Sequence, residues 1–254
     1  KGAAAGIMIT ESHNPPKYNG YKVYCDTGEQ IAPEMADEIV SYISKTDIFT
    51  GVRRMDFDEA VSKGLIEMIT SADEDKFVSR VLEQQQNPGI AKSADMGIVY
   101  TPLHGSGNIP VRKALKAAGF DKVWVVPEQE KPDPAFSTVK SPNPEDKAGF
   151  YLAEDLAAKT GAELIIGTDP DCDRVGVMAK NKDGKFDSFT GNQIGVILLE
   201  YLISAKKKNG TLSKNAAVIK TIVSTYLADR MCESYGVACM NVLTGFKFIG
   251  EKIR

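Results

Sequence analysis

The sequence predicts an α/β protein: successive α/β domains with mixed, mostly parallel sheets that are covered by helices. Short apolar runs alternate with longer amphipathic runs along most of the 254 residues. Strands that alternate with helices in this way form sheets with helices on their faces. Asn87-Pro88-Gly89 interrupts the pattern, as turn residues at a domain boundary do. We therefore expect three units, at residues 1–85, 86–189 and 190–254.

The first unit is expected to contain strands followed by helices. Asn19-Gly20 is a turn dipeptide between two apolar stretches, and Pro33 suits the first turn of a helix. Ser71 and Glu74 have the spacing of a capping box at the start of another helix. The expected elements are a buried strand at residues 6–10, a returning strand at 21–24, helices at 33–44 and from 71 onward, and a transition at 46–70.

Strand and helix alternate most regularly from residue 97 onward. Gly119, Gly161 and Gly236 follow amphipathic runs and are expected to end helices, because glycine tolerates the left-handed conformation found there. Thr190 is a candidate N-cap of a long helix. The expected strands are residues 97–100, 122–126, 164–167, 175–179, 217–220 and 237–243; the expected helices are 109–118, 148–159, 190–204, 224–235 and 246–253; a proline-rich loop is expected at 127–144.

Charge and hydropathy exclude several classes of partner. The net charge of −3 gives no support to nucleic-acid binding, and Lys206-Lys207-Lys208 falls where cations complement the end of a predicted helix. The apolar run Ala3–Ile9 is too short to span a membrane and is a poor signal peptide. We expect neither a nucleic-acid nor a membrane partner, and the oligomeric state stays open. Because the chain starts at Lys1 in an apparent core strand, it is expected to be a piece of a longer protein.

The cysteines favour a reducing compartment. Cys25, Cys172, Cys232 and Cys239 form no C-x-x-C pair, and the chain has only two histidines. A structural zinc site is therefore not expected. Unpaired cysteines are typical of the cytoplasm, which is the expected location.

Three carboxylates at alternate positions follow one of the apolar runs. Asp169, Asp171 and Asp173 come after the strand expected at residues 164–167, and Arg174 closes the segment. Ligands of α/β proteins bind at the carboxyl ends of strands. Mg²⁺ prefers oxygen ligands in octahedral geometry, and three carboxylates on an extended loop can converge on one ion. The segment therefore predicts a Mg²⁺ site, with Arg174 placed to bind a phosphate oxygen.

Other interpretations of this segment are an acidic surface turn, a calcium loop and a nucleophilic aspartate. A helix-loop-helix calcium site fails, because its required glycine and glutamate would fall on Arg174 and Lys180. Asp171-Cys172-Asp173-Arg174-Val175 matches the D-x-D-x-V signature of haloacid-dehalogenase-like phosphatases and mutases, whose first Asp is a nucleophile. In those proteins this Asp directly follows the strand, whereas here Gly167-Thr168-Asp169-Pro170 intervenes.

A second polar loop, far upstream, presents a hydroxyl group. Thr10-Glu11-Ser12-His13-Asn14-Pro15 follows the apolar run Ala3–Ile9. A serine is a weak nucleophile unless a base, a metal or prior phosphorylation assists it. His13 is adjacent to Ser12, but adjacent side chains do not usually face each other, and there is no G-x-S-x-G motif. By itself Ser12 is more typical of a helix cap, so its functional interpretation depends on Lys22 and the acidic loop.

Four segments resemble loops of the α-D-phosphohexomutases. Residues 10–22, Thr-Glu-Ser-His-Asn-Pro-Pro-Lys-Tyr-Asn-Gly-Tyr-Lys, are similar to the active-site loop of that family. Residues 169–174 resemble its metal-binding loop, and residues 101–107 and 244–247 resemble further loops. Residues 19–24 are closest to the phosphoglucomutase and phosphopentomutase branch. The family has four domains around a cleft, so this chain would hold the end of the first, the whole second and about half of the third.

The resemblance implies a hexose-phosphate mutase, an intramolecular phosphotransferase that interconverts the 1-phosphate and 6-phosphate of a hexose, with glucose the first expectation. Ser12 would be carried as phosphoserine, give its phosphoryl group to a hexose monophosphate, and recover the other phosphate from the hexose bisphosphate. Asp169, Asp171, Asp173 and the Ser12 phosphate would hold Mg²⁺.

The resemblance also implies roles for other residues. Lys22 and His13 would be general acid/base candidates, Lys22 the stronger, with its pKa lowered by the metal and by Arg174. Without the motif, Lys22 is an ordinary exposed strand lysine. His104 is equally well explained as an ordinary loop histidine. The positions that match family contacts to sugar or phosphate are Lys220, Thr244, Gly245 and Lys247, which are otherwise ordinary residues at strand ends.

Departures from the family pattern leave alternatives open. Glu11 stands where the family usually has a small residue, and Pro170 and Cys172 replace glycine and a small residue. A phosphomannomutase or a phosphopentomutase is the alternative activity. A different class is a metal-binding fragment without activity of its own, because the sugar-recognition loop and fourth domain are expected beyond Arg254.

Overall fold

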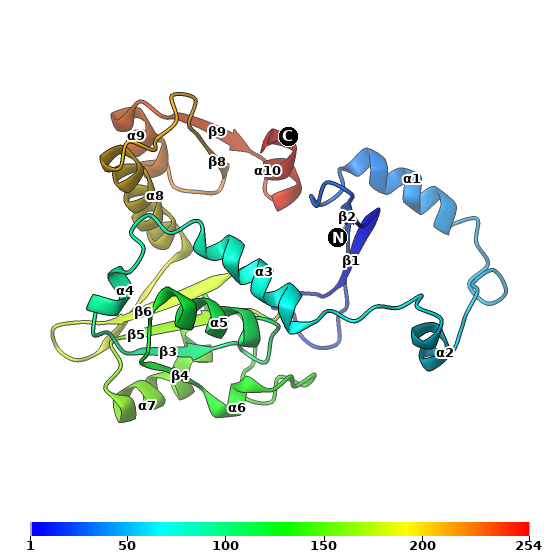
Figure 1. Cartoon of the computed structure of the whole chain (residues 1–254), viewed down its shortest axis with the longest axis horizontal. Helices are drawn as coiled ribbons and strands as arrows, with labels where there is room; N and C mark the ends of the chain where they lie inside the picture. Colours follow the sequence, from blue (N-terminus) through cyan, green and yellow to red (C-terminus); the bar gives the residue numbers. More distant parts are fainter. Residues whose placement is uncertain (1, 254) are drawn as a thin grey trace.

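The computed structural model describes residues 2–253 and contains three separate sheets (Figure 1). The strands, in their order within each sheet, are β1 (Ala5–Ile9) and β2 (Tyr21–Cys25); β4 (Val123–Val125), β3 (Ile98–Thr101), β5 (Leu164–Thr168), β6 (Val175–Lys180) and β7 (Phe186–Phe189); and β8 (Ala217–Thr221) and β9 (Ala238–Val242). A mixed central sheet and two strand pairs, accompanied by helices, confirm the expected α/β class.

The strand at residues 6–10 was expected to be buried, and this expectation is wrong. Within residues 2–253, β1 pairs only with β2, in antiparallel register, and Ile7 and Ile9 remain 60% and 57% exposed. The helices that follow, α1 (Pro33–Ile43) and α2 (Phe57–Ser62), lie away from the central sheet (Figure 1). No residue of α1 is buried, so this helix does not cover the strand pair with a packed layer.

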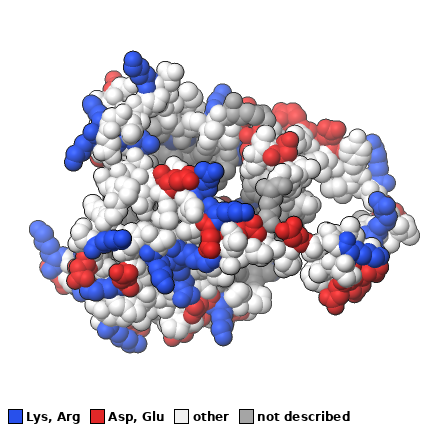
Figure 2. Space-filling model, viewed as in Figure 1, with Lys and Arg blue, Asp and Glu red and all other residues white. Residues whose placement is uncertain are grey.

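Helix α3 (Ser71–Leu82) joins the N-terminal segment to the central sheet. Its capping box consists of Thr70 and Asp73, one residue before the expected pair Ser71 and Glu74. The Asp73 carboxylate accepts the Thr70 backbone N–H, and Glu74 instead pairs with Lys113 of α5 (Asn108–Ala118) at 2.7 Å. In Figure 2 acidic side chains over α3 lie beside basic ones over α5.

The central sheet combines parallel and antiparallel strands. β3 pairs parallel with both β4 and β5, whereas β6 pairs antiparallel with β5 and β7. β7 was not expected from the sequence, because Phe186-Asp187-Ser188-Phe189 has only two apolar residues next to a turn. Pairing with β6, which supplies its backbone partners, stabilises it as an edge strand.

Helices cover the central sheet and complete its core. The short segments are α4 (Ile90–Ser93), α6 (Pro127–Glu130) and η1 (Lys147–Phe150), and α7 (Tyr151–Thr160) follows η1 directly. Ala153 and Ala157 of α7 are fully buried against Val99 and Ile165 of the sheet. Gly119 and Gly161 end α5 and α7 with φ values of 104° and 74°, as expected for left-handed C-caps.

The last segment consists of α8 (Gly191–Lys208), β8, α9 (Leu227–Tyr235), β9 and α10 (Phe246–Ile253). Thr190 and Gln193 form the capping box of α8. α9 begins three residues later than expected, because Ser224 bonds to Thr221 in the preceding turn. Ile203, Cys232 and Val237 form a small core under the parallel β8–β9 pair. Over residues 2–253, no helix is long and apolar enough to cross a membrane.

Candidate active site

The aspartate loop begins where β5 ends, as the sequence predicted. Asp169 follows Thr168, the last residue of β5, and is fully buried. One of its carboxylate oxygens, Oδ1, accepts the backbone N–H groups of Asp173 at 3.1 Å and Arg174 at 2.9 Å. These bonds curl the loop around Asp169, and the backbone turns back at Cys172, which has φ 60°.

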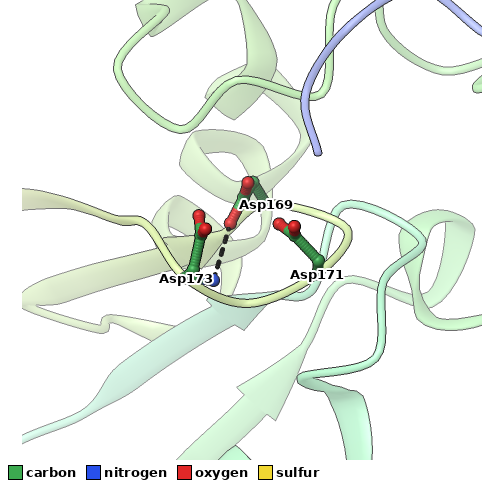
Figure 3. Close-up of side chains that lie close together, drawn as sticks. All are labelled: Asp169, Asp171 and Asp173. Atoms are coloured by element: carbon green, nitrogen blue, oxygen red, sulfur yellow. Dashed lines mark hydrogen bonds between the residues drawn. The ribbon is translucent and has the colours of Figure 1, made fainter. Parts of the chain in front are cut away.

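The three carboxylates of this loop converge. One ligand atom from each of Asp169, Asp171 and Asp173 lies within 4.8 Å of the others. Figure 3 shows the three side chains gathered on one side of the loop. Asp171 Oδ1 is buried and has no hydrogen-bond partner among residues 2–253. A buried carboxylate oxygen without a partner is costly, so the geometry fits a hard cation that would bind there.

The loop at residues 102–107 supports the aspartate loop from below. Ser106 donates its backbone N–H and its hydroxyl to the carbonyl of Pro170, at 2.8 and 3.0 Å. Gly107 packs so closely that a Cβ there would lie 2.7 Å from Cys172 Sγ and 2.8 Å from Thr168 Oγ1. Residues 102–107, part of a segment that resembles a family loop, thus hold the aspartate loop and its carboxylates in position.

The serine loop, 157 residues earlier in the chain, reaches the same point. Ser12 Oγ donates a hydrogen bond to Asp169 Oδ2 at 2.5 Å. Ser12 has a left-handed backbone, φ 55°, and its N–H is held by Thr10 Oγ1 at 2.8 Å. His13 Nδ1 lies 3.1 Å from Ser12 Oγ, so the two adjacent side chains do face each other. The hydroxyl and the carboxylates therefore belong to one site.

Strand β2 brings Lys22 to this site. Lys22 pairs with Met8 of β1, and Gly20, just before the strand, packs against the Thr10 carbonyl without room for a Cβ. The Lys22 ammonium lies 2.9 Å from Asp171 Oδ2 and 3.3 Å from Asp173 Oδ2. Arg174, in contrast, extends toward Glu145, 3.9 Å away, with its side chain 39% exposed.

Burial and neighbouring charges shift the pKa values of these groups. Burial raises the pKa of Asp169 to about 6, with the hydrogen bond from Ser12 acting against it. Burial would also raise the pKa of Asp171, but hydrogen bonds, first that from Lys22, bring it below its usual range. Burial lowers the pKa of His13, and the charge of Arg174 lowers it further.

The carboxylates of the aspartate loop raise the pKa of Lys22. Burial would lower it, but the hydrogen bonds and charges of Asp171 and Asp173 outweigh burial and raise it. The lowered pKa expected beside a bound metal and Arg174 stays a prediction. With the ammonium bound to two carboxylates, Lys22 is held in its protonated form, as a proton donor rather than an acceptor.

The remaining predicted site residues lie on the last segment of the chain. Lys220, at the end of β8, is 8% exposed and pairs with Asp229 of α9 at 3.0 Å. Thr244, Gly245 and Lys247 lie where β9 passes into α10, and Gly245 has φ 131°. Within residues 2–253, the polar and cation–π contacts of the Lys220 and Lys247 ammonium groups stay in this segment and do not reach the serine or aspartate loops. The substrate contacts of all four residues stay a prediction.

The sequence did not identify a residue that tethers the serine loop. Ser141 Oγ donates to the backbone carbonyl of His13 at 3.1 Å. His104 holds the segment that precedes Ser141. The two His104 ring nitrogens lie 2.8 Å from the Lys131 carbonyl and 2.8 Å from Thr138 Oγ1. His104 therefore shapes a loop that contacts the site. Only the run Ser141-Pro142-Asn143-Pro144, a rigid turn, hinted at such a role.

Family models match most of the chain. The models for phosphoglucomutase/phosphomannomutase alpha/beta/alpha domains I, II and III match residues 1–48, 75–184 and 190–254. These matches do not test the domain boundaries expected at residues 85 and 189, which stay predictions.

Individual proteins show the same similarity. The phosphoglucomutase of Staphylococcus saprophyticus is 36% identical over 249 residues, and that of Staphylococcus aureus strain MRSA252 is 37% identical over 253 residues. Each comparison covers 98% of this chain and 44% of the relative, so the chain spans under half of these relatives. The crystal structure of a phosphoglucomutase/phosphomannomutase family protein from Burkholderia thailandensis has a TM-score of 0.67 at 20% identity, over 98% of this chain and 47% of that one, which shows the fold alone.

Proposed function

The chain belongs to the phosphoglucomutase/phosphomannomutase family, and we propose that it carries the phosphoryl-transfer centre of a hexose-phosphate mutase. The proposed reaction moves a phosphate between the 1- and 6-positions of a hexose, most simply glucose, through a hexose bisphosphate. The observation that carries the proposal is the contact between the Ser12 hydroxyl and Asp169, one of three convergent carboxylates.

In this proposal Ser12 is the phosphoryl carrier. Its phosphoserine form would transfer the phosphoryl group to a free hydroxyl of the hexose monophosphate, and the P–O bond to Ser12 Oγ would break. The second phosphate of the bisphosphate would then return to Ser12 Oγ, so that phosphate is conserved over the cycle. Such chemistry depends mainly on positioning and on neutralising charge.

Asp169, Asp171 and Asp173, together with the Ser12 phosphate, would hold Mg²⁺. The ion would offset negative charge on the transferring group when bound. The buried Asp171 Oδ1, unpartnered among the described residues, supports this assignment. Arg174, which is partly exposed beside the loop, is proposed to bind a phosphate oxygen, as guanidinium groups do well.

Proton transfer is proposed for Lys22 and His13. His13 touches Ser12 Oγ, and its lowered pKa favours the neutral imidazole, the form that accepts a proton. Lys22 is the stronger candidate by resemblance, and it begins as a donor because two carboxylates hold its proton. Substrate contacts are proposed for Lys220, Thr244, Gly245 and Lys247 of the last segment. The four free cysteines support a cytoplasmic site of action.

Phosphopeptide mass spectrometry of the full-length protein, after incubation with a hexose 1,6-bisphosphate, tests the proposal. The added phosphoryl mass is expected on Ser12 and to be lost in Ser12→Ala. Labelling of Asp171 instead would favour the haloacid-dehalogenase-like route and contradict the serine route. Turnover of glucose, mannose and pentose phosphates by the same protein would identify the sugar.

The alternative of a metal-binding fragment makes a different prediction for residues 1–254. The chain spans 44% of its relatives, and a hexose phosphate must be gripped at both ends for the reaction to proceed. We expect the isolated chain to bind Mg²⁺ but to show little mutase activity, while the full-length protein is active. If the full-length protein binds the ion but turns over none of the three sugar phosphates, the result would support the alternative class, a metal-binding protein without mutase activity.

A further inference from the structure

Lys22 places a positive charge of the protein itself inside the acidic site. Its ammonium lies within hydrogen-bond distance of Asp171 and Asp173, two of the three convergent carboxylates. The Asp171 side chain is only 4% exposed, and one of its oxygens has no partner within residues 2–253. Carboxylates removed from water need opposite charge or hydrogen bonds. The single Lys22 ammonium meets this need only in part. It is one positive charge beside three carboxylates, and it does not reach Asp171 Oδ1.

We propose that the Lys22 ammonium takes the place of the divalent ion in the metal-free protein and leaves Asp171 and Asp173 when an ion binds. Lys22 is then an internal competitor of the metal. This inference rests on the proposed metal site but goes beyond it, because it concerns how the site is kept stable before loading and what the arriving ion displaces.

The geometry allows the exchange. The Lys22 side chain is 28% exposed, so the ammonium has water beside it, and the lysine stem is flexible. Its partners, Asp171 Oδ2 and Asp173 Oδ2, are oxygens that a bound ion would need. Asp169 loses no lysine contact in the exchange, because its oxygens accept hydrogen bonds from Ser12 and the loop backbone and not from Lys22. Loading of the ion therefore frees the Lys22 ammonium from Asp171 and Asp173.

Metal affinity of the 254-residue chain tests this competition directly. Mn²⁺ serves as the probe, with free ion measured by electron paramagnetic resonance, and Mg²⁺ is measured by calorimetry. Lys22→Gln is expected to bind both ions more tightly, by about fivefold or more, because the competing charge is gone. Lys17→Gln removes the same charge from an exposed lysine of the same loop and is expected to leave the affinity unchanged. Equal or weaker binding by a folded Lys22→Gln would overturn the proposal.

A measurement on the unaltered chain covers the case in which Lys22→Gln does not fold. Acetylation of each lysine by an amine-reactive ester is followed by mass spectrometry, with and without saturating Mg²⁺. If the ion displaces Lys22 from the carboxylates, the labelling of Lys22 relative to Lys17 is expected to rise severalfold. An unchanged or reduced ratio would contradict the exchange.

Asp171→Asn separates failure of this inference from failure of the proposed site. If the unaltered chain binds no ion, or if Asp171→Asn binds as well as the unaltered chain, the metal site itself is wrong and this inference falls with it. If Asp171→Asn abolishes binding while Lys22→Gln leaves it unchanged, the metal site stands and only the competition is wrong.

Discussion

Two residues of the site hold backbone conformations that side chains disfavour. Ser12 and Cys172 have φ values of 55° and 60°, in the left-handed region. Such conformations cost on the order of 1 kcal/mol or more and persist only where neighbours enforce them. For Ser12 the neighbours are Thr10 and Asp169, which hold its N–H and its hydroxyl. The strain at Ser12 therefore lies where the serine loop meets the aspartate loop, and that at Cys172 lies between two of the convergent carboxylates.

Asp133 offers a pH test at the scale of one residue. Its carboxylate accepts the Ser137 hydroxyl at 2.5 Å and backbone N–H groups of Ser137 and Ala135, and these bonds lower its pKa to about 2. The folded pKa lies below the unfolded value, so the stabilisation is complete above about pH 4 and is lost as the pH falls toward 2.

A ¹³C titration of the side-chain carboxyl of Asp133 checks this prediction. The midpoint is expected near the folded pKa of about 2, and the free-energy difference between the unaltered chain and Asp133→Asn is expected to shrink between about pH 4 and 2. A midpoint at the ordinary aspartate value of about 4 would show that the bonds across the 133–137 turn do not form.

At the scale of elements, close packing of residues 102–107 against the aspartate loop holds the three carboxylates in position. Gly107 lies under the aspartate loop, where a Cβ would come within 2.6 Å of the Tyr100 hydroxyl and 2.7 Å of Cys172 Sγ. Gly107→Ala is expected to push these groups apart and to reduce the free energy of unfolding by about 1–3 kcal/mol. Divalent-ion affinity should fall with it, because the three carboxylates would no longer converge.

Gly195→Ala is the matched control for this substitution. Gly195 lies inside α8. Apart from its chain neighbours and the backbone of its own helix, no atom of residues 2–253 lies within 4 Å of the point that an added Cβ would occupy. The same change there is therefore expected to stabilise the chain by about 0.5–1 kcal/mol. Urea unfolding of both variants measures the difference. Gly107→Ala with unchanged stability and unchanged ion affinity would refute the supporting role of this loop.

At the scale of the whole molecule, the site depends on contact between segments far apart in the chain. Ser141, 128 residues after His13, donates to the His13 carbonyl and tethers the serine loop to the loop between α6 and η1. Ser141→Ala removes a hydrogen bond worth about 1 kcal/mol. We expect faster amide hydrogen exchange across residues 10–14, with little change in the core around Val99.

Ser141→Thr is the control, because it keeps the hydroxyl and is expected to restore most of the protection. Exchange measured by mass spectrometry distinguishes the two variants. Equal exchange in Ser141→Ala and the unaltered chain would mean that the serine loop is positioned by Asp169 and Lys22 alone.

The sequence determined most of the elements and the chemistry of the site. The spacing of apolar residues, the helix caps and the turn residues specified helices such as α5 and α7, because these signals act within a few residues. The glycines expected to end these two helices were confirmed. The alternate carboxylates after an apolar run, and the resemblance of residues 10–22 to a family loop, identified the candidate residues without any geometry.

Only the tertiary structure decided which of these groups meet and in what state. It left β1 exposed although its sequence is apolar, because burial depends on what packs against a strand. It placed the Lys22 ammonium on Asp171 and Asp173, which raise its pKa, and the sequence had not predicted this contact. It also added Ser141, whose hydroxyl carries no local signal. Contacts between residues more than about 100 positions apart depend on the packing of whole segments, and neither period nor spacing encodes that packing.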